Sequence, residues 1–234
     1  MRPLQQRTFR KAETMPRRPR IILPGFPHHI THRGNRREAI FQEEEDRTFY
    51  LGHLQKCSQL HRIRVYSYCL MTNHIHLIIV PETKPGPSRC LHDLHGRYAT
   101  YFNQEYCLNG HLWQERFYAC ALDIEHLWNA IRYVELNPVR AGIVPVAEDY
   151  PWSSAAAHCR LKSDPILDPN FPPEVMRRGW SDWLAKGLPK ENLEHIRQAT
   201  WKGIPCSSDS FLRQVETMFG IPLLPRRSGR QPGT

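Results

Sequence analysis

The stretch from residue 63 to 81, IRVYSYCLMTNHIHLIIVP, restricts the fold more than any other part of the sequence. It is rich in β-branched and aromatic residues, which favour strands, and it ends at Pro81. A polar break at Thr72-Asn73 divides it into two apolar runs. Two strands that are separated by so short a break are most economically a β-hairpin.

The segments before and after this hairpin predict a strand and two helices. His28 to Thr31 precedes the turn-like Arg33-Gly34-Asn35 and is expected to form a first strand. Apolar residues recur at helical spacing in Asp46 to Leu60 and again in Cys90 to Cys107. We therefore expect one helix between the first strand and the hairpin and a second helix after the hairpin.

A fourth strand and a third helix complete the pattern. Trp113 to Leu122 is expected to be the strand, and Asp123 is placed to cap the helix that follows. Pro138 bends or ends this helix. The order strand, helix, strand, strand, helix, strand, helix predicts an α+β fold of the ferredoxin-like, split βαβ type, with an antiparallel sheet and helices packed on one face.

The chain length of 234 residues suits one domain with a substantial extension. Residues 1–20 are highly charged and predict a basic N-terminal arm, and residues 21–160 hold the predicted domain. From residue 161 to 234 prolines recur, with helical stretches at Glu191 to Thr200 and Phe211 to Phe219 and a basic tail, PRRSGRQPGT. We interpret this last part as a mostly helical C-terminal extension.

Two histidines in the second strand of the hairpin are the first candidate site. A strand has a side-chain period of two, so His74 and His76 point to one face while Ile75 points into the opposite layer. Two imidazoles that are aimed at a common point can bind a divalent metal and leave positions open for water or phosphate oxygens. The alternative, a hydrogen-bonded histidine pair on a half-exposed strand, stays open on this pattern alone.

A tyrosine and an asparagine in the third helix are the second candidate. Tyr133 and Asn137 are four residues apart, so on a helix both face the same side. A tyrosine nucleophile that attacks a phosphodiester forms a phosphotyrosine link, and an amide oxygen one turn away can complete a metal shell. The alternative is that Tyr133 is a core aromatic residue and Asn137 merely ends the helix.

Other tyrosines compete for the role of nucleophile. Tyr98 and Tyr101 share the apolar side of the second predicted helix, so core packing is the better interpretation for both. Tyr118 lies on the fourth predicted strand near Arg116 and could stack on a base.

The composition favours a polyanionic partner in a reducing compartment. The formal net charge is +9, with 32 basic and 23 acidic residues, which favours nucleic acid. Seven cysteines without a C-x-x-C pair argue against a zinc ribbon or a disulfide framework. The sequence has neither a run of eighteen apolar residues nor a secretory signal, so we expect a cytoplasmic protein without a membrane partner.

Four ordered segments resemble the REP-associated tyrosine transposases. They are HHITHRGNRREAIF, YCLMTNHIHLIIVP, LWQERFYACAL and YVELNPVRAGIV, the last followed by YPWSS. This family is related to the transposases of the smallest bacterial insertion sequences (IS200-like), within the histidine-hydrophobic-histidine class of DNA nickases. The resemblance covers about residues 15 to 160 and extends more loosely into GIPCSSDSFLRQVETMFGIPL.

The resemblance implies a metal-dependent enzyme that cleaves and rejoins single-stranded DNA near an imperfect palindromic hairpin. It implies that His74 and His76 bind Mg²⁺ or Mn²⁺, that Tyr133 forms a 5′-phosphotyrosine intermediate, and that Asn137 is a third ligand. Relatives include dimers and monomers, so a monomer and a homodimer are both expected states. The pattern begins near residue 15, so residues 1–14 have no assigned function.

The expected DNA contacts come from basic and aromatic residues around the first strand and the third helix. Trp113 and Trp152 could stack on unpaired bases, although burial is the commoner outcome for tryptophan. Each arginine could equally be a solvated surface charge. The candidate arginines are Arg33, Arg36, Arg37, Arg116 and Arg140.

Two other functions remain open from the sequence. A catalytically silent regulator would bind a DNA hairpin without cutting it, and a metal hydrolase that uses water as its nucleophile would not need Tyr133. A pure binding protein has no chemical need for His74, His76, Tyr133 and Asn137 together, which favours the enzyme.

Overall fold

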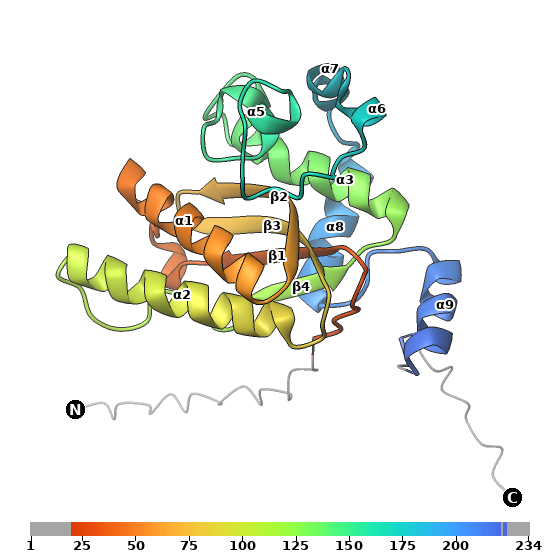
Figure 1. The fold of residues 1–234 in the computed structure, drawn as a ribbon, viewed down its shortest axis with the longest axis horizontal. Helices are drawn as coiled ribbons and strands as arrows, with labels where there is room; N and C mark the ends of the chain where they lie inside the picture. The colour runs from red at the N-terminus through yellow and green to blue at the C-terminus, as the bar shows by residue number, and fades with distance from the viewer. Residues whose placement is uncertain (1–19, 221, 224–234) are drawn as a thin grey trace, which may run out of the picture.

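A computed structural model of the chain describes residues 20–220 and 222–223 (Figure 1). The predicted basic arm, apart from Arg20, and the tail PRRSGRQPGT lie outside these residues. The centre of the molecule is a four-stranded antiparallel sheet in the order β2-β3-β1-β4. The strands are β1 (His28–Arg33), β2 (Ile63–Met71), β3 (His74–Pro81) and β4 (Tyr118–Ala121). This order confirms the ferredoxin-like prediction.

The predicted hairpin is formed by β2 and β3, with Met71 opposite His74 across a two-residue turn. The turn is fixed by the segment after β1, because the carbonyl of Thr72 accepts hydrogen bonds from two backbone amides and that of Asn73 accepts one from Gly34. A Cβ atom at Gly34 would lie 2.4 Å from the carbonyl oxygen of Glu38, so only glycine allows this close approach. The start of β3 is thereby held in place.

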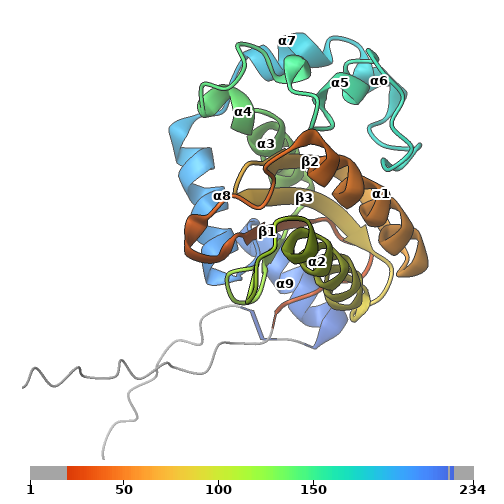
Figure 2. The ribbon, with the colours of Figure 1, turned by 90° about the vertical axis from the view of Figure 1, so that its left-hand side faces the viewer.

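Helices α1 (Glu44–Leu60) and α2 (Gly86–Glu105) pack against each other and against β2 on one face of the sheet (Figure 2). The core on this side includes Ile75, Leu77 and Ile79 of β3. Tyr98 is fully buried here, as predicted, and its hydroxyl donates to the carbonyl of Ile40. Tyr101 stacks on Phe49 with 4.0 Å between ring centroids, which also confirms its packing role.

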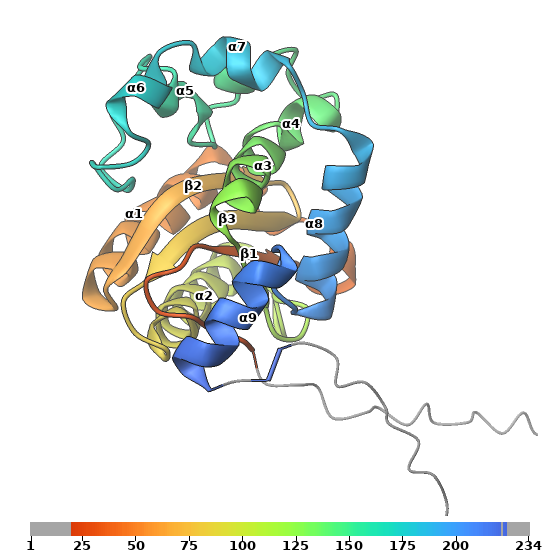
Figure 3. The ribbon, with the colours of Figure 1, turned by 90° about the vertical axis from the view of Figure 1, so that its right-hand side faces the viewer.

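The opposite face is covered by α3 (Ile124–Glu135) and α8 (Lys190–Lys202), and Figure 3 shows both helices on this side. His76 and Ile78 of β3 point this way, since Ile78 belongs to the core with α3 and His76 contacts Tyr133. Asp123 caps α3 as predicted, because its carboxylate accepts the backbone N–H of His126 at 2.9 Å. The prediction that the helices pack on one face of the sheet was therefore wrong, because α3 and α8 cover the face opposite α1 and α2.

Two predicted elements differ in extent from the observed ones. The fourth strand was expected from Trp113 to Leu122, but β4 begins only at Tyr118. Trp113 forms an isolated bridge to Gly34, and its indole stacks on His95, so this segment is fixed by side-chain packing instead of a ladder. The third helix ends at Glu135, and Pro138 lies in the first turn of a separate short helix, α4 (Asn137–Arg140).

The remaining elements are short and lie around the sheet and the helices that cover its two faces. They are η1 (Asn35–Arg37), η2 (Ala147–Asp149), α5 (Ala155–His158), α6 (Glu174–Arg177), α7 (Trp180–Ala185) and α9 (Asp209–Phe219). The described part of residues 161–234 is therefore mostly helical, as predicted. Among the described residues, no helix is long and apolar enough to span a membrane.

Candidate active site

The structure brings His74, His76, Tyr133 and Asn137 together in the lining of one cavity of about 530 Å³. The two histidine rings have centroids 4.9 Å apart and meet edge to face. The two histidines lie at the start of β3, next to the hairpin turn, whereas Tyr133 lies in the last turn of α3. Residues that are about 60 positions apart in the sequence thus share one concave site.

Each of the two histidines uses one ring nitrogen for a protein contact. His74 Nδ1 lies 2.7 Å from Asn73 Oδ1, and His76 Nδ1 lies 2.9 Å from His29 Nε2. Within the described residues, neither Nε2 atom has a hydrogen-bond partner. Burial and the charge of Arg33 lower the pKa of His74 to about 4, and burial lowers the pKa of His76 well below its ordinary value. Both imidazoles are therefore neutral at pH 7.

This donor set fits a divalent cation. Neutral imidazole is the form that binds metals, and metal-binding histidines commonly engage their second nitrogen in a hydrogen bond that fixes the ring. Two nitrogen ligands leave several positions for oxygen donors. Among the described residues that line the cavity, none is acidic, so those further donors would be a neutral side chain such as Asn137, water or phosphate.

His29 is a component of the site that the sequence reasoning missed. It lies on β1, is 1% exposed, and connects His76 to Thr200 of α8, whose Oγ1 is 2.8 Å from His29 Nδ1. Burial lowers the pKa of His29 to about 3, so this ring is also neutral. Because β1 pairs with β3 only through tertiary folding, the sequence signal was limited to a polar residue at an inward position of an apolar strand.

Tyr133 packs its ring against both buried histidines. The ring centroid lies 5.4 Å from that of His76 and 5.6 Å from that of His29, both in edge-to-face geometry. The guanidinium carbon of Arg140 is 4.5 Å from the Tyr133 centroid. Tyr133 is 6% exposed, and its hydroxyl has no hydrogen-bond partner within the described part of the chain. The ring is thus held by packing while the hydroxyl stays available.

Asn137 and Arg140 form a short network at the end of α3. Arg140 Nη2 donates to the carbonyl of Tyr133 at 2.7 Å and to Asn137 Oδ1 at 2.8 Å. Asn137 Nδ2 donates back to the carbonyls of Tyr133 and Val134. Asn137 therefore caps the helix that carries Tyr133, and its amide oxygen keeps a second lone pair beyond the one that Arg140 uses.

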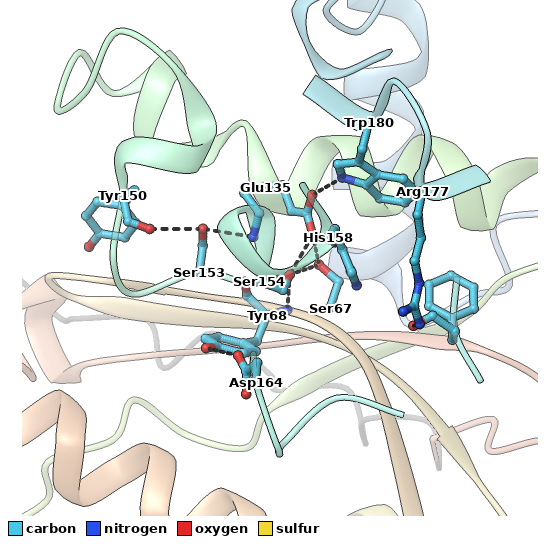
Figure 4. A network of polar contacts seen from close by, with 12 residues as sticks. Ser67, Tyr68, Glu135, Tyr150, Ser153, Ser154, His158, Asp164, Arg177 and Trp180 are labelled. Carbon is cyan, nitrogen blue, oxygen red and sulfur yellow. Dashed lines mark hydrogen bonds and ion pairs between the residues drawn. The ribbon is translucent and has the colours of Figure 1, made fainter. Parts of the chain in front are cut away.

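A buried carboxylate two residues beyond Tyr133 fixes the same helix end (Figure 4). Glu135 is fully buried, and both of its oxygens accept hydrogen bonds, at distances between 2.5 and 3.2 Å. Burial opposes its ionisation, but the contact with an imidazole and the other hydrogen bonds hold the pKa of Glu135 below its ordinary value. The four donors come from β2, the α5 region and α7: Ser67, Ser154, His158 and Trp180.

The predicted DNA-contact arginines separate into two groups. Arg33, Arg37 and Arg140 line the cavity with His74 and His76. Arg116 instead lines a different cavity, of about 440 Å³, together with Trp113. Arg36 lies in η1 with a positive φ of 53° and lines neither of these two cavities.

Helix α8 adds cationic and aromatic side chains that the sequence reasoning did not single out. Arg197 and Trp201 line the cavity, and Trp201, which is 70% exposed, stacks on Tyr118 with centroids 5.2 Å apart. Their spacing of four residues was the available signal, with Arg197 inside the predicted helical stretch Glu191 to Thr200 and Trp201 directly after it. Trp152, a predicted stacking candidate, instead packs half-buried against the core.

Comparisons with known proteins bear on the family and on the fold. Residues 25–137 match the family model of IS200-like transposases. A putative REP-associated tyrosine transposase from Haemophilus influenzae is 28% identical over 124 residues, which are 45% of this chain and 66% of that protein. A solved REP-associated tyrosine transposase bound to a REP hairpin shares the fold, with a TM-score of 0.50 and 19% identity over 67% of this chain and 93% of that one. Residues 25–137 are therefore the part of the chain that is similar to the IS200-like transposase family.

Proposed function

We propose that this protein is a metal-dependent single-stranded DNA endonuclease and strand transferase that acts through a 5′-phosphotyrosine intermediate. The observation that carries the proposal is the contact of the Tyr133 ring with His76 and His29 inside an arginine-lined cavity. A structural tyrosine would need neither the free imidazole nitrogens nor the surrounding positive charge.

The proposed reaction is a transesterification. The Tyr133 hydroxyl loses its proton, and its oxygen attacks the scissile phosphorus. The bond from phosphorus to the 3′ oxygen breaks, the 3′ oxygen takes a proton, and the 5′ phosphate stays on the tyrosine. A free 3′-hydroxyl reverses these changes, so one site cleaves and joins strands. A cation held by His74, His76 and Asn137 would polarise the phosphate and stabilise its developing charge.

The remaining cavity residues bind and orient the strand in this proposal. Arg33, Arg37 and Arg140 offset phosphate charge, with Arg140 held next to the Tyr133 ring. The exposed Trp201 on Tyr118 offers a stacking surface for an unpaired base. Such stacking is tolerant of base identity and suits single-stranded DNA.

We also propose an imperfect palindromic hairpin as the feature that the protein recognises. The resemblance of the sequence to REP-associated transposases supports it, as does the shared fold with a relative whose structure holds a REP hairpin. We further propose that the protein works in the cytoplasm, as a monomer or a homodimer. The positive charge of the chain and of the cavity agrees with a nucleic-acid partner.

The test mixes the full-length protein with a labelled single strand that carries the palindromic repeat of its host, with Mn²⁺ or Mg²⁺. We expect a covalent protein-DNA adduct on a denaturing gel, and we expect Tyr133→Phe to abolish it. Tyr66→Phe is the matched control, because Tyr66 is half-buried and stacks on Phe171 away from the cavity. Cleavage without an adduct in Tyr133→Phe would indicate a water nucleophile, and hairpin binding without cleavage would indicate a regulator.

A further inference from the structure

A second group of metal-ligating side chains lies outside the proposed active site. It consists of His126 near the start of α3, His195 on α8, and Cys206 in the segment after α8. One ligand atom from each of the three residues lies within 4.8 Å of the others. None of the three lines the cavity with Tyr133. The group therefore needs its own explanation.

The His126 ring is oriented as a ligand by a carboxylate. Asp123 Oδ1 lies 2.7 Å from His126 Nδ1, which leaves Nε2 for a further partner. The ring of His195 stands edge to face with it, with centroids 5.2 Å apart. A carboxylate on the outer nitrogen of a histidine is the usual support of a metal-bound imidazole. The same contact also occurs in proteins without a metal. The case for a metal site therefore depends on the other two ligands.

The backbone of Cys206 is fixed next to these rings, and its thiol is hydrogen-bonded to that of Cys120. Its backbone N–H donates to the carbonyl of Ala121 at 2.8 Å, and Cys206 forms a parallel bridge with Leu122. The residue is fully buried, whereas His195 is exposed. The site thus has two ligands in the protein wall and one at the surface, where water would be the fourth ligand.

We propose that His126, His195 and Cys206 bind a zinc-type cation that joins α8 to α3. Two imidazoles and a thiolate are the donors that zinc prefers, whereas Mg²⁺ and Mn²⁺ prefer oxygen ligands. On binding, the S–H bond of Cys206 breaks, a sulfur-metal bond forms, and the proton passes to water. The thiolate and the Asp123 carboxylate together offset the double charge of the cation.

The position of this site gives it a consequence for the cavity. Helix α3 carries both His126 and Tyr133, and α8 carries both His195 and Thr200, which contacts His29. Seven residues of helix separate His126 from Tyr133, about 10 Å along the axis. A cation between the two helices would therefore fix the wall of the cavity without touching the DNA. The binding itself does not depend on the transposase proposal.

The test uses the full chain with His74→Ala and His76→Ala, so that the other imidazole pair is absent. After chelation and reconstitution, we expect one equivalent of zinc to remain on desalting, measured by elemental analysis. Cobalt in its place should give the near-ultraviolet absorption of a cobalt-thiolate bond. Zinc should also slow hydrogen exchange in α8, because it links that helix to α3.

Variants of two ligands and of the supporting carboxylate distinguish the site from adventitious binding. Cys206→Ser should lose the cobalt-thiolate absorption, and His195→Ala, which changes an exposed side chain, should weaken zinc binding by at least about 100-fold. Asp123→Asn keeps a capping residue and should weaken it by about 10-fold to 100-fold. The exposed residues Cys107 and His92 provide controls, Cys107→Ser and His92→Ala, that should bind normally. Substoichiometric zinc, or unchanged affinity in His195→Ala, would overturn the proposal.

Discussion

Strand β1 carries two buried histidine contacts on its two faces, and they differ in how their nitrogens are used. His32, on the α2 side, places Nδ1 2.9 Å from His95 Nδ1 and Nε2 3.2 Å from the carbonyl of Glu115. His95 Nε2 meets the hydroxyl of Tyr50 at 3.0 Å, so all four nitrogens of this couple have protein partners. Nothing is left over for a ligand.

The His29–His76 couple on the other face is similar in distance but not saturated. His29 Nε2 lies 2.9 Å from His76 Nδ1, and His29 Nδ1 contacts Thr200. His76 Nε2, however, has no hydrogen-bond partner within the described residues. That nitrogen belongs to a residue of the arginine-lined cavity. The two couples therefore differ in whether one nitrogen remains unused at an open volume, which is the condition for binding a further ligand.

The largest effect is expected from His76→Ala. This substitution removes the unused nitrogen, so we expect the single-turnover rate of adduct formation in Mn²⁺ to fall by at least about 1,000-fold. Far-ultraviolet circular dichroism checks that the variant is folded. A rate within about tenfold of the unsubstituted protein would show that the two histidine couples do not differ in function.

His95→Ala should lower the stability of the protein and leave the rate of adduct formation nearly unchanged. It leaves His32 Nδ1 and the Tyr50 hydroxyl without partners in a buried site and opens a void. We expect the free energy of unfolding to fall by about 2 to 4 kcal/mol, measured by denaturant titration. The adduct rate per folded molecule should change less than about twofold. A large loss of rate in folded protein would mean that this couple also takes part in the chemistry.

His29→Ala tests the contact that orients the His76 ring. Because His29 accepts from or donates to His76 Nδ1, its loss frees the ring to rotate, and we expect the Mn²⁺ affinity of the site to fall by about 10-fold to 100-fold. Isothermal titration measures this without DNA. Thr200→Val, one contact further out, should give a smaller change in the same direction, and equal effects of both variants would contradict the proposed order.

Part of the candidate site could be predicted from local sequence patterns. The hairpin, the positions of His74 and His76 on one strand face, and the spacing of Tyr133 and Asn137 are all consequences of strand and helix periodicity. They predicted which side chains share a direction, and the structure places all four at one cavity. Periodicity is readable because it depends only on neighbours in the chain.

What could not be predicted depends on contacts between distant segments. The contact of His29 with Thr200 spans 171 positions, and Trp201 reaches Tyr118 only because α8 packs on β4. Trp113 likewise lies outside the strand in which it was predicted, because its indole stacks on His95. In each case a side chain and its partner belong to elements whose packing is decided by tertiary structure, which no local pattern encodes.

The smallest effect concerns acid, because burial lowers the pKa of the imidazoles in both couples and of His28 beside them. Burial lowers the pKa of His28 and of His32 to about 4. The unfolded chain takes up these protons near pH 6.5, before the folded protein does, so the stability present above pH 6.5 falls as the pH falls towards 4. From pH 7 to 5.5 each imidazole should cost about 1 kcal/mol, so denaturant midpoints should decrease. His32→Gln should flatten this dependence, and a slope that is unchanged in His32→Gln would show that the saturated couple does not resist protonation.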